Sequence, residues 1–187
     1  MSERDPADAA EIGLQLLVMR CQAGDERAFA QLMDGFGART LRYLRGLVGD
    51  AADDVQQEVW LSVYRGIGGL ANPRAFRTWL YRTTRHRVVD FLRRENRHTE
   101  LISCEPLEAV LDRAIADDQA ETGIPEEMID AIERLPIAQR EVVVLRYHDD
   151  MSYAQIALVV GCSIGTVRSR LHYAKQQLQE LLRGANQ

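Results

Sequence analysis

The chain has 187 residues, of which 46% are hydrophobic and 27% charged, and its formal net charge is −5. This composition is typical of a soluble globular protein with one domain or two small ones. No apolar run is long enough to span a bilayer, and residues 1–11 lack the basic start and apolar core of a signal peptide. The scattered Cys21, Cys104 and Cys162 argue against a disulfide framework. We therefore expect a cytoplasmic protein.

Nearly every predicted element is helical. Apolar periodicity predicts helices over residues 14–21, 25–36 and 40–48, separated or ended by Gly24 and Gly49. These segments show almost no alternation of the kind that predicts strands. The sequence therefore favours an all-α fold.

A further helix is expected after Asp50, which is a plausible N-cap. Its buried face is formed by Val55, Val59 and Val63. The first turn carries two acids that suit the helix dipole, Asp53 and Asp54. Three residues off the valine stripe form either a partner surface or an ordinary solvated face, namely Gln57, Glu58 and Leu61.

An arginine-rich helix is predicted over residues 74–94, after a break at Gly66, Gly68, Gly69 and Pro73. Its buried stripe consists of Phe76, Leu80, Val88 and Phe91. Basic residues can follow a phosphate backbone, and aromatic rings can stack on exposed bases. Trp79 suits the core and such stacking equally well. The better contact candidates lie on other faces, namely Tyr81, Arg82, Arg85 and His86.

An acidic linker is expected over residues 99–124, although residues 107–115 have the pattern of a short helix. Between residues 100 and 130 the chain holds ten acidic residues and one basic residue, Arg113, whereas residues 74–97 are strongly basic. Such asymmetry indicates different partners for different segments. Pro125 begins a second helical unit, and Pro136 begins a helix that runs to residue 147.

Residues 152–177 have the pattern of a helix-turn-helix. Ser152 can cap the first helix, Gly161 can supply the left-handed residue that ends it, and Ser163 can cap the second helix. The apolar face of the first helix is formed by Ile156, Ala157 and Val160, and that of the second by Ile164, Val167 and Leu171. The alternative is a helical hairpin that serves only to pack.

The second helix of this motif is predicted to bind DNA, because arginines lie near its start. An arginine there can donate two hydrogen bonds to guanine, worth about 1–3 kcal/mol of discrimination. Arg168 and Arg170 face different directions, so that one can read bases while the other binds phosphate. Nothing supports catalysis: residues 148–150 lack a further ligand or nucleophile, and there is no glycine-rich phosphate loop. We expect no enzyme activity, no metal and no cofactor.

Three segments resemble, in order and spacing, the extracytoplasmic-function sigma factors of the bacterial sigma-70 family. They are residues 25–67, residues 73–95 and residues 135–178, which include the strings DDVQQEVWLSVY, FRTWLYRTTRHRVVDFLRR and IGTVRSRLHYAK. The resemblance implies two small all-helical domains. Residues 1–98 would be sigma region 2, which reads the −10 element, melts DNA and docks on core polymerase. Residues 99–124 would be the linker through the RNA exit path, and residues 125–187 would be sigma region 4, which reads the −35 element.

The resemblance also implies roles for individual residues. The −35 contacts would be Ser163, Gly165, Thr166, Arg168, Ser169, Arg170, His172 and Tyr173. The −10 contacts, which include a pocket for a flipped base, would be Asn72, Arg74, Trp79, Tyr81, Arg82, Arg85, His86 and Arg93. The core-polymerase contacts would be Asp53, Asp54, Gln57, Glu58 and Leu61.

Two positions depart from the family pattern. His86 stands where many members have asparagine, and Tyr173 where many have arginine, which predicts unusual −10 and −35 preferences. The partners implied are core RNA polymerase through its β′ clamp and β flap, promoter DNA and an anti-sigma factor, with a monomeric free chain. The rival interpretations are a dimeric helix-turn-helix regulator that binds DNA unaided and a sigma mimic that sequesters an anti-sigma factor.

Overall fold

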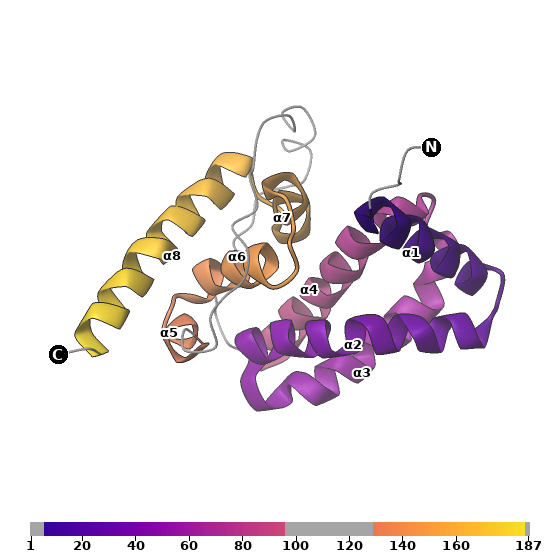
Figure 1. The fold of residues 1–187 in the computed structure, drawn as a ribbon. Helices are drawn as coiled ribbons and strands as arrows, with labels where there is room; N and C mark the ends of the chain where they lie inside the picture. The colour runs from indigo at the N-terminus through magenta and orange to yellow at the C-terminus, as the bar shows by residue number, and fades with distance from the viewer. Residues whose placement is uncertain (1–5, 96–128, 186–187) are drawn as a thin grey trace, which may run out of the picture.

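A computed structural model describes residues 6–95 and 129–185, all of whose regular elements are helices (Figure 1). The first group comprises α1 (Pro6–Gln22), α2 (Glu26–Val48), α3 (Ala52–Gly66) and α4 (Phe76–Arg94). The second comprises α5 (Ile129–Glu133), α6 (Ile137–Tyr147), α7 (Tyr153–Val160) and α8 (Ile164–Ala185). The expected all-α fold with a C-terminal helix-turn-helix is confirmed. In the part of the chain that the structure describes, no helix has the length and apolar character needed to cross a membrane.

The α1–α2 turn is fixed by Asp25, which is the N-cap of α2. Its carboxylate accepts hydrogen bonds from the backbone N–H groups of Arg27 and Ala28 at 3.0 and 3.1 Å. It also pairs with Arg20 at 2.7 Å. Gly24 precedes it with a φ of 86°, which glycine adopts without strain. Because α2 then runs unbroken to Val48, the two helices expected over residues 25–36 and 40–48 are one.

The expected valine stripe lines the core of the first domain. Val55, Val59 and Val63 are each at most 2% exposed, and the core also includes Phe76 and Leu80 of α4. Short 3-10 turns, Ile67–Gly69 and Pro73–Ala75, separate α3 from α4.

The predicted cap of α3 was wrong. The N-cap is Ala51, which makes no side-chain cap bond, because residues Gly49–Ala51 form a 3-10 turn that continues into the helix. Asp50 therefore lies inside this turn, where its side chain is not at the helix start.

The helix-turn-helix forms as expected from its caps. Ser152 and Gln155 form a reciprocal capping box at the start of α7, with bonds of 3.2 and 2.9 Å. Gly161 ends α7 in the left-handed conformation, with φ 70° and ψ 40°. The Ser163 hydroxyl accepts from the N–H of Thr166 at 3.1 Å at the start of α8. The apolar residues that face inward are buried, among them Ile156, Ala157, Val160, Val167 and Leu171.

The two domains pack against each other, with α6 on α2 and α7 on α4 (Figure 1). Their buried apolar residues belong to one continuous cluster. The sequence predicted two separate domains on a tether and gave no sign of this contact. The expected linker, residues 99–124, the short helix over residues 107–115 and the start at Pro125 lie outside the described residues.

Candidate nucleic-acid and polymerase interface

The N-terminal half of α8 presents a polar face to solvent. Gly165, Arg168, Ser169, His172 and Tyr173 are exposed, as is the cap residue Ser163, while Thr166 and Arg170 are half-buried. The buried faces of Val167 and Leu171 hold the helix against α6 and α7. Every residue of the predicted −35 set is thus brought to one end of one helix.

Arg168 and Arg170 differ in their surroundings. Arg168 is exposed, and its guanidinium carbon lies 6.0 Å from the ring centre of Tyr153 on α7. Arg170 is half-buried, and within the described part of the chain its Nη1 atom is buried without a hydrogen-bond partner. Arg168 is therefore the better placed of the two to reach a groove.

Tyr153 of α7 lies beside Arg168, a neighbour that sequence reasoning did not single out. Its ring lies near Arg168 and, 5.2 Å from its centre, near the guanidinium of Arg146. An aromatic face attracts a cation, so the Tyr153 ring is a favourable neighbour for the Arg168 guanidinium. The sequence held no signal for this contact, because Tyr153 and Arg168 lie on different helices of the motif.

Of the eight residues in the predicted −10 set, five are exposed and three are partly or fully buried. Asn72, Arg74, Arg82, His86 and Arg93 are exposed. Asn72 caps the turn before α4 by accepting from the N–H of Arg74 at 3.0 Å, so its side chain also has a structural role.

Trp79 is half-buried, with its ring against the core and 3.1 Å from the position that a Cβ on Gly66 would take. Any residue larger than glycine at position 66 would push on this indole. The structure therefore supports a packing role for Trp79 and leaves only part of its ring accessible.

The expectation that Tyr81 and Arg85 lie on exposed faces of α4 is wrong. Tyr81 is fully buried and Arg85 is 7% exposed, because the C-terminal domain covers both. The Tyr81 hydroxyl donates to Asp149, and the Arg85 Nε donates to Glu141 at 2.9 Å. A carboxylate of the second domain thus lies against each of these two residues.

His86 is exposed beside several arginines. Partial desolvation, followed by the charges of Arg82 and Arg85, lowers the pKa of its imidazole. The neutral ring therefore predominates near pH 7, with one nitrogen as donor and the other as acceptor. A neutral imidazole has one N–H donor and one acceptor nitrogen, whereas an asparagine amide has two N–H donors and a carbonyl oxygen.

The predicted polymerase-docking residues lie on the outer face of α3. Asp53, Asp54, Gln57 and Leu61 are exposed, with Leu61 at 55%. Glu58 is half-buried and pairs with Arg94 at 3.1 Å, so part of its charge is already neutralised.

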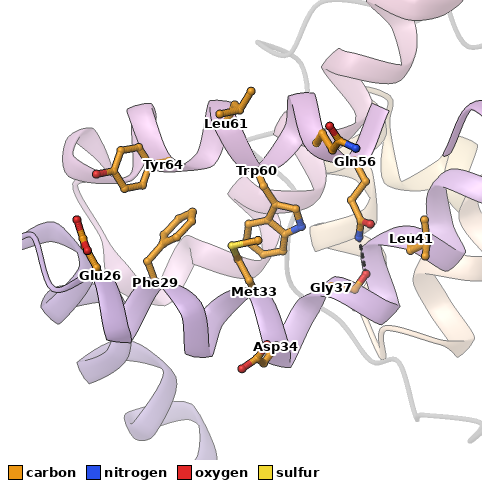
Figure 2. Close-up of a pocket in the computed structure, with 11 residues that line it drawn as sticks. Glu26, Phe29, Met33, Asp34, Gly37, Leu41, Gln56, Trp60, Leu61 and Tyr64 are labelled. Carbon is orange, nitrogen blue, oxygen red and sulfur yellow. Dashed lines mark hydrogen bonds between the residues drawn. The ribbon is translucent and has the colours of Figure 1, made fainter. Parts of the chain in front are cut away.

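Beside them a groove of about 790 Å³ runs between α2 and α3 (Figure 2). Its apolar walls are formed by Phe29, Met33, Trp60, Leu61 and Tyr64. Figure 2 shows Trp60 and Tyr64 on the α3 side, reaching toward Phe29 and Met33 of α2. Exposed apolar side chains around a groove indicate an interaction surface.

Two family models match the chain: "Sigma-70 region 2" over residues 32–98 and "Sigma-70, region 4" over residues 126–178. The RNA polymerase sigma-H factor of Pseudomonas aeruginosa is 35% identical over 91% of this chain and 96% of its own length. The extracytoplasmic-function sigma-E factor of Escherichia coli K12 is 30% identical over 88% of this chain and 91% of its own length.

Solved structures share the fold. CnrH in complex with the cytosolic domain of CnrY superposes with a TM-score of 0.64, at 23% identity over 91% of this chain and 97% of that one. RpoE of Bartonella quintana in complex with the anti-sigma factor NepR gives a TM-score of 0.57, at 24% identity over 82% of this chain and 97% of that one. With both regions matched in order and close relatives aligned nearly end to end, this chain belongs to the extracytoplasmic-function sigma factors of the sigma-70 family and is an alternative sigma factor that directs transcription initiation.

Proposed function

We propose that this sigma factor reads the −35 element with α8 and the −10 element with the arginine-rich face of α4. The domains would be residues 1–98 as region 2, residues 99–124 as the linker and residues 125–187 as region 4. The observation that carries the proposal is the exposed polar end of α8, with Arg168 and Ser169 on a helix whose other face is locked by caps and core. A helix of this kind fits the major groove with its N-terminal end toward the bases.

Core polymerase would dock through the outer face of α3 and its β′ clamp, with the β flap near the C-terminal domain. The exposed acids Asp53 and Asp54 and the exposed Leu61 support this, since a charged rim around an apolar centre is typical of protein interfaces. Docking also explains how a chain of net charge −5 functions on DNA, because the polymerase would supply much of the DNA affinity. The chain would act in the bacterial cytoplasm and be monomeric when free.

An anti-sigma factor would control this chain. Both solved structures described above are complexes, one with the cytosolic domain of CnrY and the other with the anti-sigma factor NepR. The groove between α2 and α3 and the exposed face of α8 both offer surface for such a partner.

Run-off transcription with purified core polymerase on a promoter library tests the proposal. The wild-type chain should select a defined pair of elements, and Arg168→Ala should abolish −35-dependent initiation. Tyr173→Ala should have a milder effect, and Gln179→Ala, an exposed change further along α8, should have none. If Arg168→Ala and Tyr173→Ala both had negligible effects, the assignment of α8 to the DNA major groove would be refuted.

A gel-shift assay without polymerase distinguishes a sigma factor from the rival function, a helix-turn-helix regulator. A dimeric helix-turn-helix regulator would shift its operator unaided. The free sigma factor should bind the selected promoter poorly until core polymerase is added.

A further inference from the structure

The loop between α3 and α4 is built mainly from short local turns. It consists of the two 3-10 turns, Ile67–Gly69 and Pro73–Ala75, joined by residues 70–72, of which Leu70 and Asn72 are extended. The N–H of Leu70 donates to the carbonyl at the start of the first turn at 3.1 Å. The carbonyl of Asn72 accepts from the N–H at the end of the second turn at 3.0 Å. Such bonds close each turn but do not hold the loop against the rest of the domain.

Two glycines add freedom to this loop. Gly68 and Gly69 are exposed, and within the described part of the chain the place of a Cβ on either lies more than 4 Å from any residue other than its chain neighbours. Glycine has more conformational freedom to lose on folding than any other residue. The loop therefore needs a contact with another element to keep one conformation.

Gln22, the last residue of α1, supplies such a contact. Its Nε2 donates to the carbonyl of Leu70 at 2.8 Å and to the carbonyl of Ile67 at 3.1 Å. A side-chain amide has two N–H donors, so both bonds can form at once. The bonds join residues that are 48 and 45 positions apart in the chain. Gln22 thus ties the first turn of the loop, and the residue that follows it, to α1.

The end of α1 that presents Gln22 is itself held in place. Val18 is fully buried and Cys21 is 9% exposed, so this end of the helix is anchored in the core. The guanidinium of Arg20 donates twice to the carboxylate of Asp25, at 2.7 and 3.0 Å, which fixes the turn into α2. The amide of Gln22 therefore projects from a firm support.

α1 also contacts the second turn of the loop. Gln15, two helical turns before Gln22, accepts from Arg74 Nε at 3.4 Å. The helix packs against both 3-10 turns. Because the bond to Arg74 is long, the two shorter bonds from Gln22 provide the stronger hold.

The tied segment leads directly to residues of the predicted −10 set. Asn72 and Arg74 are exposed, and Asn72 follows two residues after Leu70, whose carbonyl Gln22 binds. Asn72 also starts the second turn by accepting from the N–H of Arg74. A recognition residue needs a support that holds it within about 0.5 Å of its productive position. A shift of the Leu70 carbonyl would move both residues away from that position.

Resting on the proposed function above, we propose that Gln22 is a positioning residue for −10 recognition. Its amide holds the carbonyls of Ile67 and Leu70, and through them it places Asn72 and Arg74 against the promoter. Gln22 acts through the loop rather than by contact with DNA. Without its two bonds the loop adopts several conformations, and the base preference at the −10 element falls, while −35 reading and polymerase docking remain.

A matched pair of variants separates positioning from stability. Gln22→Met removes both donors and keeps a side chain of similar length. Gln56→Met is the control, because the half-buried Gln56 of α3 makes an equivalent pair of bonds elsewhere in the same domain. Its Nε2 donates to the carbonyl of Gly37 at 2.7 Å and to the hydroxyl of Thr40 at 3.1 Å. Both variants lose two hydrogen bonds, and only the first loses them at the loop.

Hydrogen exchange in the free full-length chain tests the hold on the loop. Mass spectrometry would follow the amides of residues 67–75 in the wild type and in both variants. Gln22→Met should exchange there at least about fivefold faster, since two hydrogen bonds to the loop are lost. Gln56→Met should match the wild type in this segment. Unchanged loop exchange in a folded Gln22→Met chain would overturn the proposal.

Run-off transcription with core polymerase tests the consequence at the promoter. A library with a fixed −35 element and a varied −10 element gives the ratio of initiation at the preferred base to that at the next best base. Gln22→Met should lower this ratio at one or more −10 positions at least about threefold. Its affinity for core polymerase should equal that of the wild type, and Gln56→Met should keep the wild-type ratio.

A second substitution covers the case in which Gln22→Met does not fold. Gln22→Glu keeps a polar side chain of the same shape, but its carboxylate oxygens repel the two carbonyls. If Gln22→Met lost its helical circular dichroism signal, Gln22→Glu would be measured in its place, with the same outcomes expected.

The positioning role and the proposed function can fail separately. If the wild type selected no −10 base while loop exchange changed as expected, the proposed −10 reading would fail and the hold on the loop would stand. If the wild type selected a −10 base and the Gln22 variants kept the full preference, the positioning role would be refuted and the proposed function would stand.

Discussion

Acidification from pH 7 to pH 5 should stabilise, through Asp149, the closed state of the chain, in which α6 packs on α2 and α7 on α4. This carboxyl group is buried between the domains, and desolvation raises its pKa from 3.8 to about 6. The hydrogen bond from Tyr81 and the charges of Arg39, Arg77 and Arg42 act in the opposite direction but do not cancel the effect of burial. In an open chain the group would be hydrated, with its pKa near the ordinary value.

The sign follows from proton binding. Between pH 6 and about pH 3.8 the closed state binds a proton at Asp149 and the open state does not, so a fall in pH through this window favours closing. From pH 7 to pH 5 a pKa of about 6 changes the closed-to-open ratio about tenfold, equivalent to about 1.4 kcal/mol. Above pH 7 the carboxylate is ionised in both states, and its contribution no longer changes.

Protonation of His148 at low pH has the opposite effect on closing, so this residue is replaced in the measurement. Burial and the charges of Arg42 and Arg39 lower the pKa of its imidazole, so the closed state resists its protonation. The assay is therefore single-molecule energy transfer between dyes on the two domains, in a His148→Gln chain with the native cysteines replaced. It counts closed and open molecules at each pH.

The decisive comparison is between the His148→Gln variant and the double variant that also carries Asp149→Asn. In the single variant the ratio of closed to open molecules should be about tenfold higher at pH 5 than at pH 7. The double variant should lose most of that pH dependence. An identical pH profile in the two chains would refute the reasoning, because Asp149 would then not be the group that titrates on closing.

Three further expectations concern other parts of the chain. Ser152→Ala removes half of the α7 capping box and should lower the free energy of unfolding by about 1 kcal/mol in urea denaturation, whereas loss below 0.3 kcal/mol would contradict the cap's role. Leu61→Asp should weaken binding to core polymerase at least about tenfold without lowering the melting temperature, since the side chain is 55% exposed, and unaltered affinity would place the docking surface elsewhere. Replacing the acids of residues 99–124 by serine or asparagine should weaken holoenzyme assembly or alter promoter escape, and unchanged transcription would count against the linker's proposed path.

Elements whose determinants are local could be predicted from the sequence. Ser152, Gly161 and Ser163 act on backbone within a few residues, and the structure confirms all three as caps or helix ends. The valine stripe of α3 was predicted because periodicity alone defines a buried face. The predicted cap Asp50 failed for a local reason too: a 3-10 turn extended the start of α3, and such turns leave no clear trace in residue type.

Burial at the domain contact could not be predicted, because its partners are remote in sequence. Tyr81 and Asp149 are 68 residues apart, and Arg85 and Glu141 are 56 apart. An arginine on a helix is normally solvated, and only the arrival of a carboxylate from another domain makes its burial possible. The helical pattern of α4 therefore predicted which face packs within the first domain. It could not predict which face the second domain covers.

The same chemistry explains how one face of α4 can have two occupants. Arg85 bears a charge that must be either hydrated or paired, and Glu141 pairs it at 2.9 Å in the closed state. If the domains separated, a DNA phosphate would offer the same guanidinium another anionic oxygen, while Glu141 returned to water. Each charge exchanges one favourable partner for another, so opening leaves no buried ion uncompensated. An apolar seal over α4 would instead have left Arg85 desolvated and unpaired while the domains were closed, which is why acidic residues serve this contact better than hydrophobic ones.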